Sequence, residues 1–168
     1  MISQKLIDAF NEQINKEFYS EYFYLAMAAW FDSENLQGCS NFFKIQVQEE
    51  RFHAMKMYDY VNERGGKVIL EAIEKPEVDF KSALEIFEKA YDHERLVTSL
   101  VNNLMDVAIE EKDHATKSFL NWFIDEQVEE EASMDAILNK LKLINGDGMG
   151  LLMLDKELSL RTFTPPAK

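Results

Sequence analysis

The sequence predicts an all-α protein: a bundle of four long helices, with a long crossover between the second and third helices and a short fifth helix towards the C-terminus. Three observations support this fold class. Apolar residues recur every three or four positions through four long stretches, which is the spacing of a helix that buries one face. Glycine and proline occur only 6 and 3 times in 168 residues, so little interrupts these stretches. Of the three connections between them, only the middle one is long.

The first and second helices are predicted for about residues 4–32 and 38–64. Gly65 and Gly66 end the second helix, because glycine readily adopts the left-handed conformation that closes a helix. Residues 66–81 contain a proline, mixed charges and no helical periodicity, so we expect a loop there.

The third helix is predicted from Ser82, whose side chain can cap it, to about Glu111. Glu85, three residues after Ser82, completes the pattern of a capping box. The chain then turns near Lys112 and Asp113 into the fourth helix, which we expect to reach about residue 144.

The glycine-rich segment 145–148 ends the fourth helix, so the bundle should cover about residues 4–144. A fifth helix is predicted for about 149–159, followed by a non-helical tail at 162–166 that contains two prolines. This helix is too apolar to stand free in water. Two interpretations remain open: it covers a surface outside its own bundle, or it packs back on that bundle.

Connection lengths predict the orientation of the helices. Short loops join the first helix to the second and the third to the fourth, so each pair should be an antiparallel hairpin. The 16 residues of 66–81 can span about 50 Å when extended, whereas a helix of about 28 residues is about 42 Å long. This loop can therefore run the length of the bundle and leave the second and third helices parallel. One such crossover is typical of ferritin-like bundles.

The composition is that of one acidic globular domain, which we expect to comprise residues 1–168. The net charge of −13 argues against nucleic acid and anionic membranes as partners. No apolar run approaches about 20 residues and no secretory signal is recognisable, so we expect no membrane span and a cytoplasmic location. The lone cysteine, Cys39, excludes an intrachain disulfide framework.

Four carboxylates stand where the helical pattern predicts core residues: Glu17, Glu50, Glu94 and Glu130, each near the middle of a different helix. An ionised carboxylate is costly in a core unless it is paired or bound to a metal, and four of them repel one another. The alternative is a set of buried acids neutralised by protons or by basic side chains. Because no lysine or arginine lies on the core stripes at their level, we predict a metal site at the bundle centre.

His53 lies three residues after Glu50 on the same helix face, which suits two ligands of one metal. On the fourth helix, Gln127 and Glu130 occupy the positions of an expected second Glu-x-x-His pair. Oxygen ligands with one imidazole favour iron or manganese. Tyr24, two turns after Glu17, either hydrogen-bonds a ligand or supplies an electron, or simply packs in the core.

Further acids adjoin these positions in the sequence. Glu49, Glu126 and Glu129, together with Glu130, form either a third, looser metal site or a solvated acidic face. Of the remaining histidines, His93 lies off the core stripe and His114 lies at a turn, so surface or capping roles are expected for both.

Short motifs extend over nearly the whole chain. They are Asn11-x-x-Ile14-x-x-Glu17-x-x-Ser20 with Tyr24-Leu25, Gln48-Glu49-Glu50 with His53-Ala54-Met55, Glu63-Arg64-Gly65-Gly66, His93-Glu94, and the acidic run 125–131. With these motifs the chain resembles the bacterial and archaeal non-haem ferritins. The resemblance implies a ferroxidase centre in which Glu17, Glu50 and His53 hold one iron. Glu50, Glu94 and Glu130 would hold the other, with Glu50 as the bridge.

The resemblance also places Gln127 and Tyr24 beside the two irons. A third iron site of the bacterial branch matches the outer acids, namely Glu49, Glu126, Glu129 and Glu130. Arg51 stands where bacterioferritins have a haem-binding methionine just after the bridging glutamate, so we expect no haem.

The activity expected from the resemblance is oxidation of ferrous iron by dioxygen or peroxide and storage of ferric mineral in a shell of 24 subunits. The fifth helix would then line the four-fold axes. Two other classes compete with this hypothesis. One is a different di-iron enzyme, such as a rubrerythrin-type peroxidase or an oxygenase, and the other is a metal-free structural bundle.

Overall fold

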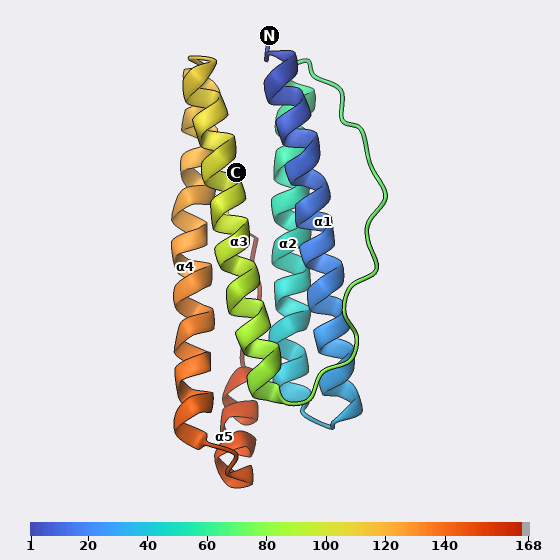
Figure 1. Ribbon diagram of the computed structural model, residues 1–168, viewed down its shortest axis with the longest axis vertical. Helices are drawn as coiled ribbons and strands as arrows, with labels where there is room; N and C mark the ends of the chain where they lie inside the picture. The colour runs from blue at the N-terminus through green and yellow to red at the C-terminus, as the bar shows by residue number, and fades with distance from the viewer. Residues whose placement is uncertain (166–168) are drawn as a thin grey trace.

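The computed structural model describes residues 1–165, and Figure 1 shows four long helices side by side with a short fifth helix at one end of the bundle. The helices are α1 (Gln4–Ser33), α2 (Gln37–Glu63), α3 (Ala83–Glu110), α4 (His114–Ile144) and α5 (Gly148–Leu158). The all-α class and the order of the elements are confirmed, and the predicted ends agree to within about one residue.

Side chains cap the N-termini of four of these helices, and the cap at Ser82 was predicted from the sequence. The Ser82 Oγ accepts a hydrogen bond from the Glu85 amide at 3.1 Å, and the Asp113 Oδ1 accepts one from the Thr116 amide at 3.0 Å. The capping box of α3 is formed differently from the prediction, because the Glu85 carboxylate accepts from the Lys81 amide at 2.6 Å. Ser3 and Asp147 cap α1 and α5 in the same way.

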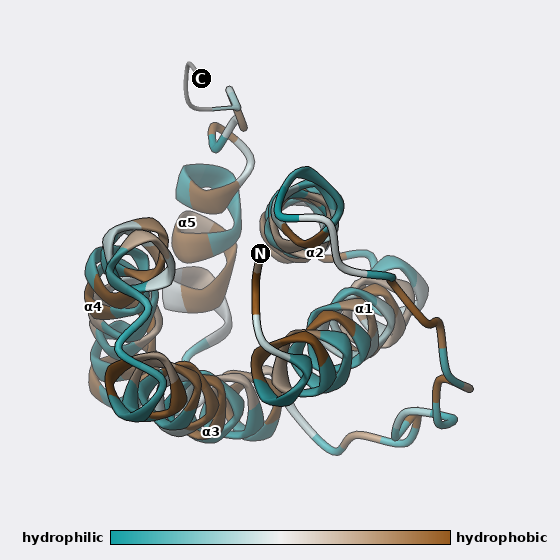
Figure 2. Ribbon diagram, turned by 90° about the horizontal axis from the view of Figure 1, so that it is seen from above, coloured by the Kyte–Doolittle hydropathy of each residue, from teal (hydrophilic) through white to brown (hydrophobic). Residues whose placement is uncertain are grey.

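The crossover after α2 leaves the bundle at one end and returns to it at the other. Figure 1 shows it running along the outer side of α1, and Figure 2 shows it lying outside the ring of helices. Gly65 has a φ of 78° and ends α2, as predicted. Asn11 on α1 holds the crossover, because its side chain donates to the Lys67 carbonyl at 3.1 Å and accepts from the Ile69 amide at 3.0 Å. The parallel arrangement of α2 and α3 is therefore confirmed.

The apolar core is divided into two clusters. The cluster towards α5 is built around large buried side chains such as Phe31, Phe43 and Phe87, and the cluster at the opposite end contains Phe10 and Ile14. On every long helix, the carboxylate singled out in the sequence falls between the residues of one cluster and those of the other. A polar layer therefore crosses the middle of the bundle.

The spacing of apolar residues predicts a core stripe on α3 at positions 84, 87, 91, 94, 98, 101, 105 and 108, and the buried face differs slightly from it. Leu84, Tyr91 and Thr98 are half-buried, whereas Ala90 and Val97 are buried. The difference arises because α3 packs against both α1 and α4, so its covered face is broader than one stripe. Glu94 belongs both to the predicted stripe and to the observed buried face.

Helix α5 packs on its own bundle through one face only. Leu154 and Leu158 are buried there, while Leu152 and Met153 are exposed. At Gly38 the backbone of α2 comes so close to α5 that an added Cβ would lie 1.6 Å from the Asp155 carbonyl oxygen. The tail at 162–165 is not helical, as predicted, and Pro166 lies outside the described residues. No helix within residues 1–165 is long and apolar enough to cross a membrane.

Candidate metal centre

The polar layer brings together carboxylates from all four long helices. Glu17, Glu50 and Glu94 are at most 1% exposed, and Glu130 is 5% exposed. Each of them comes from the middle of its helix and points between the two apolar clusters, where water is largely excluded. Such burial is costly for charged groups, so the arrangement requires protons or a cation to balance it.

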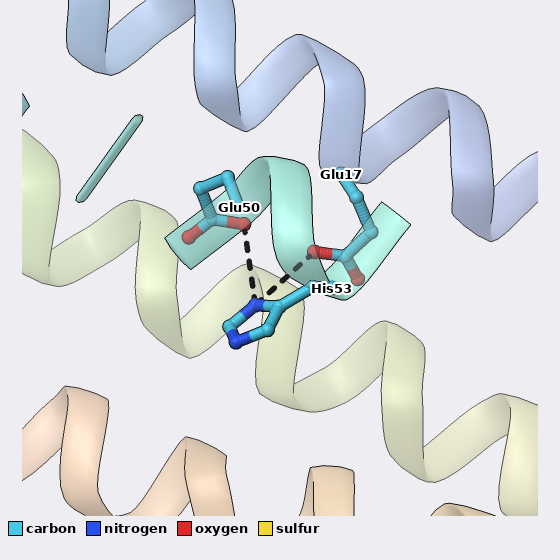
Figure 3. A group of neighbouring side chains, drawn as sticks. All are labelled: Glu17, Glu50 and His53. Carbon is cyan, nitrogen blue, oxygen red and sulfur yellow. Dashed lines mark ion pairs between the residues drawn. The ribbon is translucent and has the colours of Figure 1, made fainter. Parts of the chain in front are cut away.

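Glu17, Glu50 and His53 form the tighter part of the site, which we call the inner group. One possible ligand atom from each lies within 4.8 Å of the others. The His53 Nδ1 is 3.6 Å from the Glu50 Oε2 and 3.9 Å from the Glu17 Oε2, and Figure 3 shows both carboxylates directed at this ring nitrogen. Neither Oε2 has a hydrogen-bond partner within the described residues. Two buried and unpartnered carboxylate oxygens beside an imidazole nitrogen fit a metal ion.

Glu126 and Glu130 of α4 also lie near this imidazole and form with it the outer group. His53, Glu126 and Glu130 each offer an atom within 4.8 Å of the others, and the His53 Nε2 is 4.0 Å from the Glu126 Oε1. His53 therefore belongs to both groups: its Nδ1 faces Glu17 and Glu50, and its Nε2 faces Glu126.

Glu94 lies in the same layer but belongs to neither of these groups. The Tyr24 hydroxyl donates to its Oε1, and the Gln127 Nε2 donates to its Oε2 at 3.1 Å. Burial raises the pKa of Glu94 to about 8, with repulsion from Glu130 adding to the effect and the Tyr24 and Gln127 hydrogen bonds opposing it. The two sequence-derived neighbours of the site, Tyr24 and Gln127, are thus both in contact with one of its acids.

The charged form of Glu50 is also disfavoured. Burial is the main reason that its pKa lies well above the usual value, and repulsion from Glu94 and Glu17 adds to it. Without a metal, the surroundings of this carboxyl group therefore favour its protonated form. A cation among the acids would reverse the balance and favour the ionised form.

Two glutamines that the sequence interpretation did not single out support the acids. The Gln13 Nε2 donates to the Glu17 Oε1 at 2.7 Å, and the Gln46 Nε2 donates to the Glu130 Oε2 at 2.9 Å. Their signal in the sequence is spacing, since Gln13 and Gln46 precede Glu17 and Glu50 by four residues and so share a helix face with them. By fixing one oxygen of a carboxylate, each amide leaves the other oxygen available to a ligand.

The two remaining predicted acids, Glu49 and Glu129, differ in their surroundings. Glu49 is half-buried and forms an ion pair with Arg161 at 2.7 Å, while Glu129 is exposed and belongs to neither group. Burial raises the pKa of Glu49 to about 7, against the opposing effect of Arg161.

The expectation of a surface or capping role for His93 was wrong. His93 is half-buried against the rings of Tyr19, Phe23 and Tyr24, and it shares a hydrogen bond of 2.8 Å with Ser20. The reason is that α1 covers the side of α3 next to the core stripe. Burial lowers the pKa of His93 to about 4. His114, the first residue of α4, is exposed.

The same arrangement of helices occurs in known proteins. A family model described as a ferritin-like domain matches residues 7–144. A bacterial non-heme ferritin of Staphylococcus aureus (strain MRSA252) is 45% identical over 163 residues, which cover 97% of this chain and 98% of the relative.

Two solved structures are also similar to the chain over nearly its whole length. A humanized archaeal ferritin has a TM-score of 0.97 at 53% identity, covering 98% of this chain and 100% of its own. An open pore ferritin from the archaeon Archaeoglobus fulgidus has a TM-score of 0.95 at 53% identity, covering 96% of this chain and 100% of its own.

Proposed function

The chain belongs to the ferritin family, and we propose that it oxidises ferrous iron at the acidic centre of each bundle and stores the ferric product in a cage built from copies of itself. Iron is in this sense both substrate and cargo. The observation that carries the proposal is the pair of buried, unpartnered oxygens, Glu17 Oε2 and Glu50 Oε2, that face the His53 Nδ1.

The residues of the layer divide between two iron ions. The inner group of Glu17, Glu50 and His53 holds the first ion. Glu94 and Glu130 hold the second, and Glu50, whose charge is repelled by Glu94, Glu17 and Glu130, bridges the two. Tyr24 and Gln127 position the Glu94 carboxylate by hydrogen bonds to its two oxygens.

The donor set explains why iron would be oxidised here. Carboxylate oxygens are hard ligands, and they stabilise the smaller and more highly charged ferric ion over the ferrous ion. Two ferrous ions give one electron each to the oxidant. With dioxygen and two protons the products are two ferric ions and hydrogen peroxide, and with peroxide and two protons they are two ferric ions and two waters.

The outer acids supply a third, weaker iron site beside the first two. Its core is the outer group of His53, Glu126 and Glu130, and Glu49 lies close enough for Glu126 and Glu130 to repel its charge. Glu129 is exposed and would join only by a change of its side-chain conformation.

The exposed face of α5 supports assembly. Met149, Leu152 and Met153 are between 58% and 69% exposed, which is unfavourable for a single subunit in water. We assign this face to contacts between subunits in a shell of 24 copies. The cage is cytoplasmic. It binds no haem, because Arg51 follows the bridging Glu50 and forms an ion pair with Glu21 at 2.7 Å.

Oxygen uptake after addition of ferrous iron tests the proposal. The wild-type protein should consume oxygen rapidly, and Glu50→Ala should slow the initial rate by at least about tenfold because both irons lose a ligand. Glu88→Ala, which removes an exposed acid from α3, should leave the rate unchanged. Equal rates for the wild type and Glu50→Ala would contradict the assignment of the site.

A further inference from the structure

The chain after α5 turns back and docks on α2, next to the acids. Figure 1 shows it returning along the bundle from the end that carries α5. The Asn41 side chain donates to three backbone carbonyls of this segment: those of Leu158 at 3.2 Å, Ser159 at 3.5 Å and Arg161 at 3.0 Å. Further along, the Phe163 ring meets the Phe52 ring with centroids 6.1 Å apart. The docked tail therefore has a defined position on α2.

Arg161 is held at three points by residues of α2. Its Nη2 donates to the Glu49 Oε2 at 2.7 Å, and its Nη1 donates to the Phe42 carbonyl at 3.4 Å. The guanidinium lies over the Phe42 ring, 4.3 Å from the centroid. The side chains of Arg161 and Glu49 are 23% and 14% exposed, so the pair is shielded from most of the solvent. A stacked and hydrogen-bonded arginine in such a place keeps its position.

This ion pair matters because Glu49 lies close enough to Glu126 and Glu130 for them to repel its charge. A divalent ion held by the outer group and by Glu49 would need the charge of Glu49 and would repel a fixed guanidinium beside it. The guanidinium and the metal ion therefore compete for the same carboxylate. No comparable cation contacts the inner group within residues 1–165, where the Gln13 side-chain amide donates to the Glu17 Oε1.

We propose that Arg161 sets the affinity of the outer acids for a third ferrous ion, because its ion pair with Glu49 must be broken or shared when that ion binds. Arg161 is thus a positioning residue and does not touch the reacting ions of the inner site. The inference rests on the proposed function, in which the outer acids bind iron. Through Arg161, the tail after α5 would directly influence the affinity of the third site for ferrous iron.

The test counts ferrous ions bound per subunit at equilibrium without oxygen, by ultrafiltration of the assembled protein over a range of ferrous iron concentrations. Wild type should show two tightly bound ions and a weaker third. Arg161→Gln should bind the third ion about tenfold more tightly, equivalent to about 1.4 kcal/mol, and leave the first two unchanged. Arg161→Lys keeps the positive charge, so its affinity for the third ferrous ion should be closer to that of the wild type.

Lys140→Gln is the matched control, because it removes the same charge from a different ion pair, between Lys140 on α4 and Glu157 on α5. Lys140→Gln should not alter the affinity for the third ferrous ion. Asn41→Ala gives a second route that changes no charge: it removes the hydrogen bonds that dock the tail and should also tighten the third ion. Glu49→Gln should weaken the third ion and abolish any further effect of Arg161→Gln.

The possible outcomes separate the two proposals. A third ion that binds equally or more weakly in both Arg161→Gln and Asn41→Ala, with the first two ions intact, would overturn the role of Arg161. If the wild type bound no ferrous iron tightly, the proposed function itself would be wrong. If Arg161→Gln did not assemble, Asn41→Ala and Arg161→Lys would decide the matter by the same measurement.

Discussion

The phenolic hydroxyl of Tyr24 on α1 donates a hydrogen bond to the carboxylate of Glu94 on α3. Both side chains are fully buried, and the bond joins the first hairpin, α1 with α2, to the second hairpin, α3 with α4. Burial and the neighbouring Glu94 raise the pKa of Tyr24 well above its usual value, so the hydroxyl keeps its proton and remains a donor. Through this contact Tyr24 bonds to one of the four buried acids and does more than pack in the core around them.

Tyr24→Phe should lower the free energy of unfolding of the metal-free protein by about 1.5–3 kcal/mol, the usual range for a hydrogen bond to a charged group. The effect should be largest near pH 9, where Glu94, with its pKa of about 8, is mostly ionised. Urea unfolding in the presence of a chelator measures it. Tyr22→Phe on the exposed side of α1 serves as the control and should change stability by less than about 0.5 kcal/mol. Equal stabilities for the two variants would contradict the assigned bond.

The metal-free protein should become less stable as the pH rises from about 4.5 to about 8. In the folded state Glu94 keeps its proton up to a pKa of about 8, whereas in the unfolded state it loses the proton near 4.5. The folded state therefore binds more protons in this window, and each such proton lowers the unfolding free energy by about 1.4 kcal/mol per pH unit. Glu50, whose pKa is also raised, adds to the trend.

Chemical unfolding of the metal-free protein at several pH values between 5 and 9 would reveal this slope. Glu94→Gln cannot ionise at this position and should flatten the profile, while Glu88→Gln on the exposed face of the same helix should not. A profile that rises with pH over this window would show that the acids of the layer are already ionised without metal.

Gly38→Ala should displace α5 from the bundle. The new methyl group would lie 1.6 Å from the Asp155 carbonyl oxygen, and a backbone atom in a helix cannot move aside alone. We expect a loss of about 1–3 kcal/mol in stability and faster cleavage of residues 145–148 in limited proteolysis. Gly148→Ala meets nothing within 4 Å of its new methyl group, so it should behave like the wild type.

The fold and the inner acids could be predicted because their signals are local. A glutamate in an otherwise apolar series with helical spacing stands out, and connection lengths alone determine that α2 and α3 are parallel. Gln13 and Gln46 escaped notice because neutral amides are common on exposed helix faces. His93 was misjudged for a different reason: the neighbour that covers it, α1, is known only once the helices are packed.

The pairing of Arg161 with Glu49 could not be predicted from the sequence at all. The two residues are 112 positions apart, and their contact depends on how α5 turns the chain back onto α2. The acidic run 125–131 indicated only that this part of the fourth helix carries many negative charges. Which acids face one another, and which has a basic partner, depends on side-chain positions that spacing does not specify.

The division of the polar layer between the two hairpins affects how the chain folds. Contacts within each hairpin are close in sequence, so each hairpin can form early, whereas the meeting of the two halves waits for the crossover to close. Glu17, Glu50 and His53 belong to the first half, and Glu94 and Glu130 belong to the second. Docking therefore brings like charges together, so refolding should be slower at high pH and faster with divalent ions. We therefore expect the acids that are proposed to bind iron to control also the rate at which the two halves join.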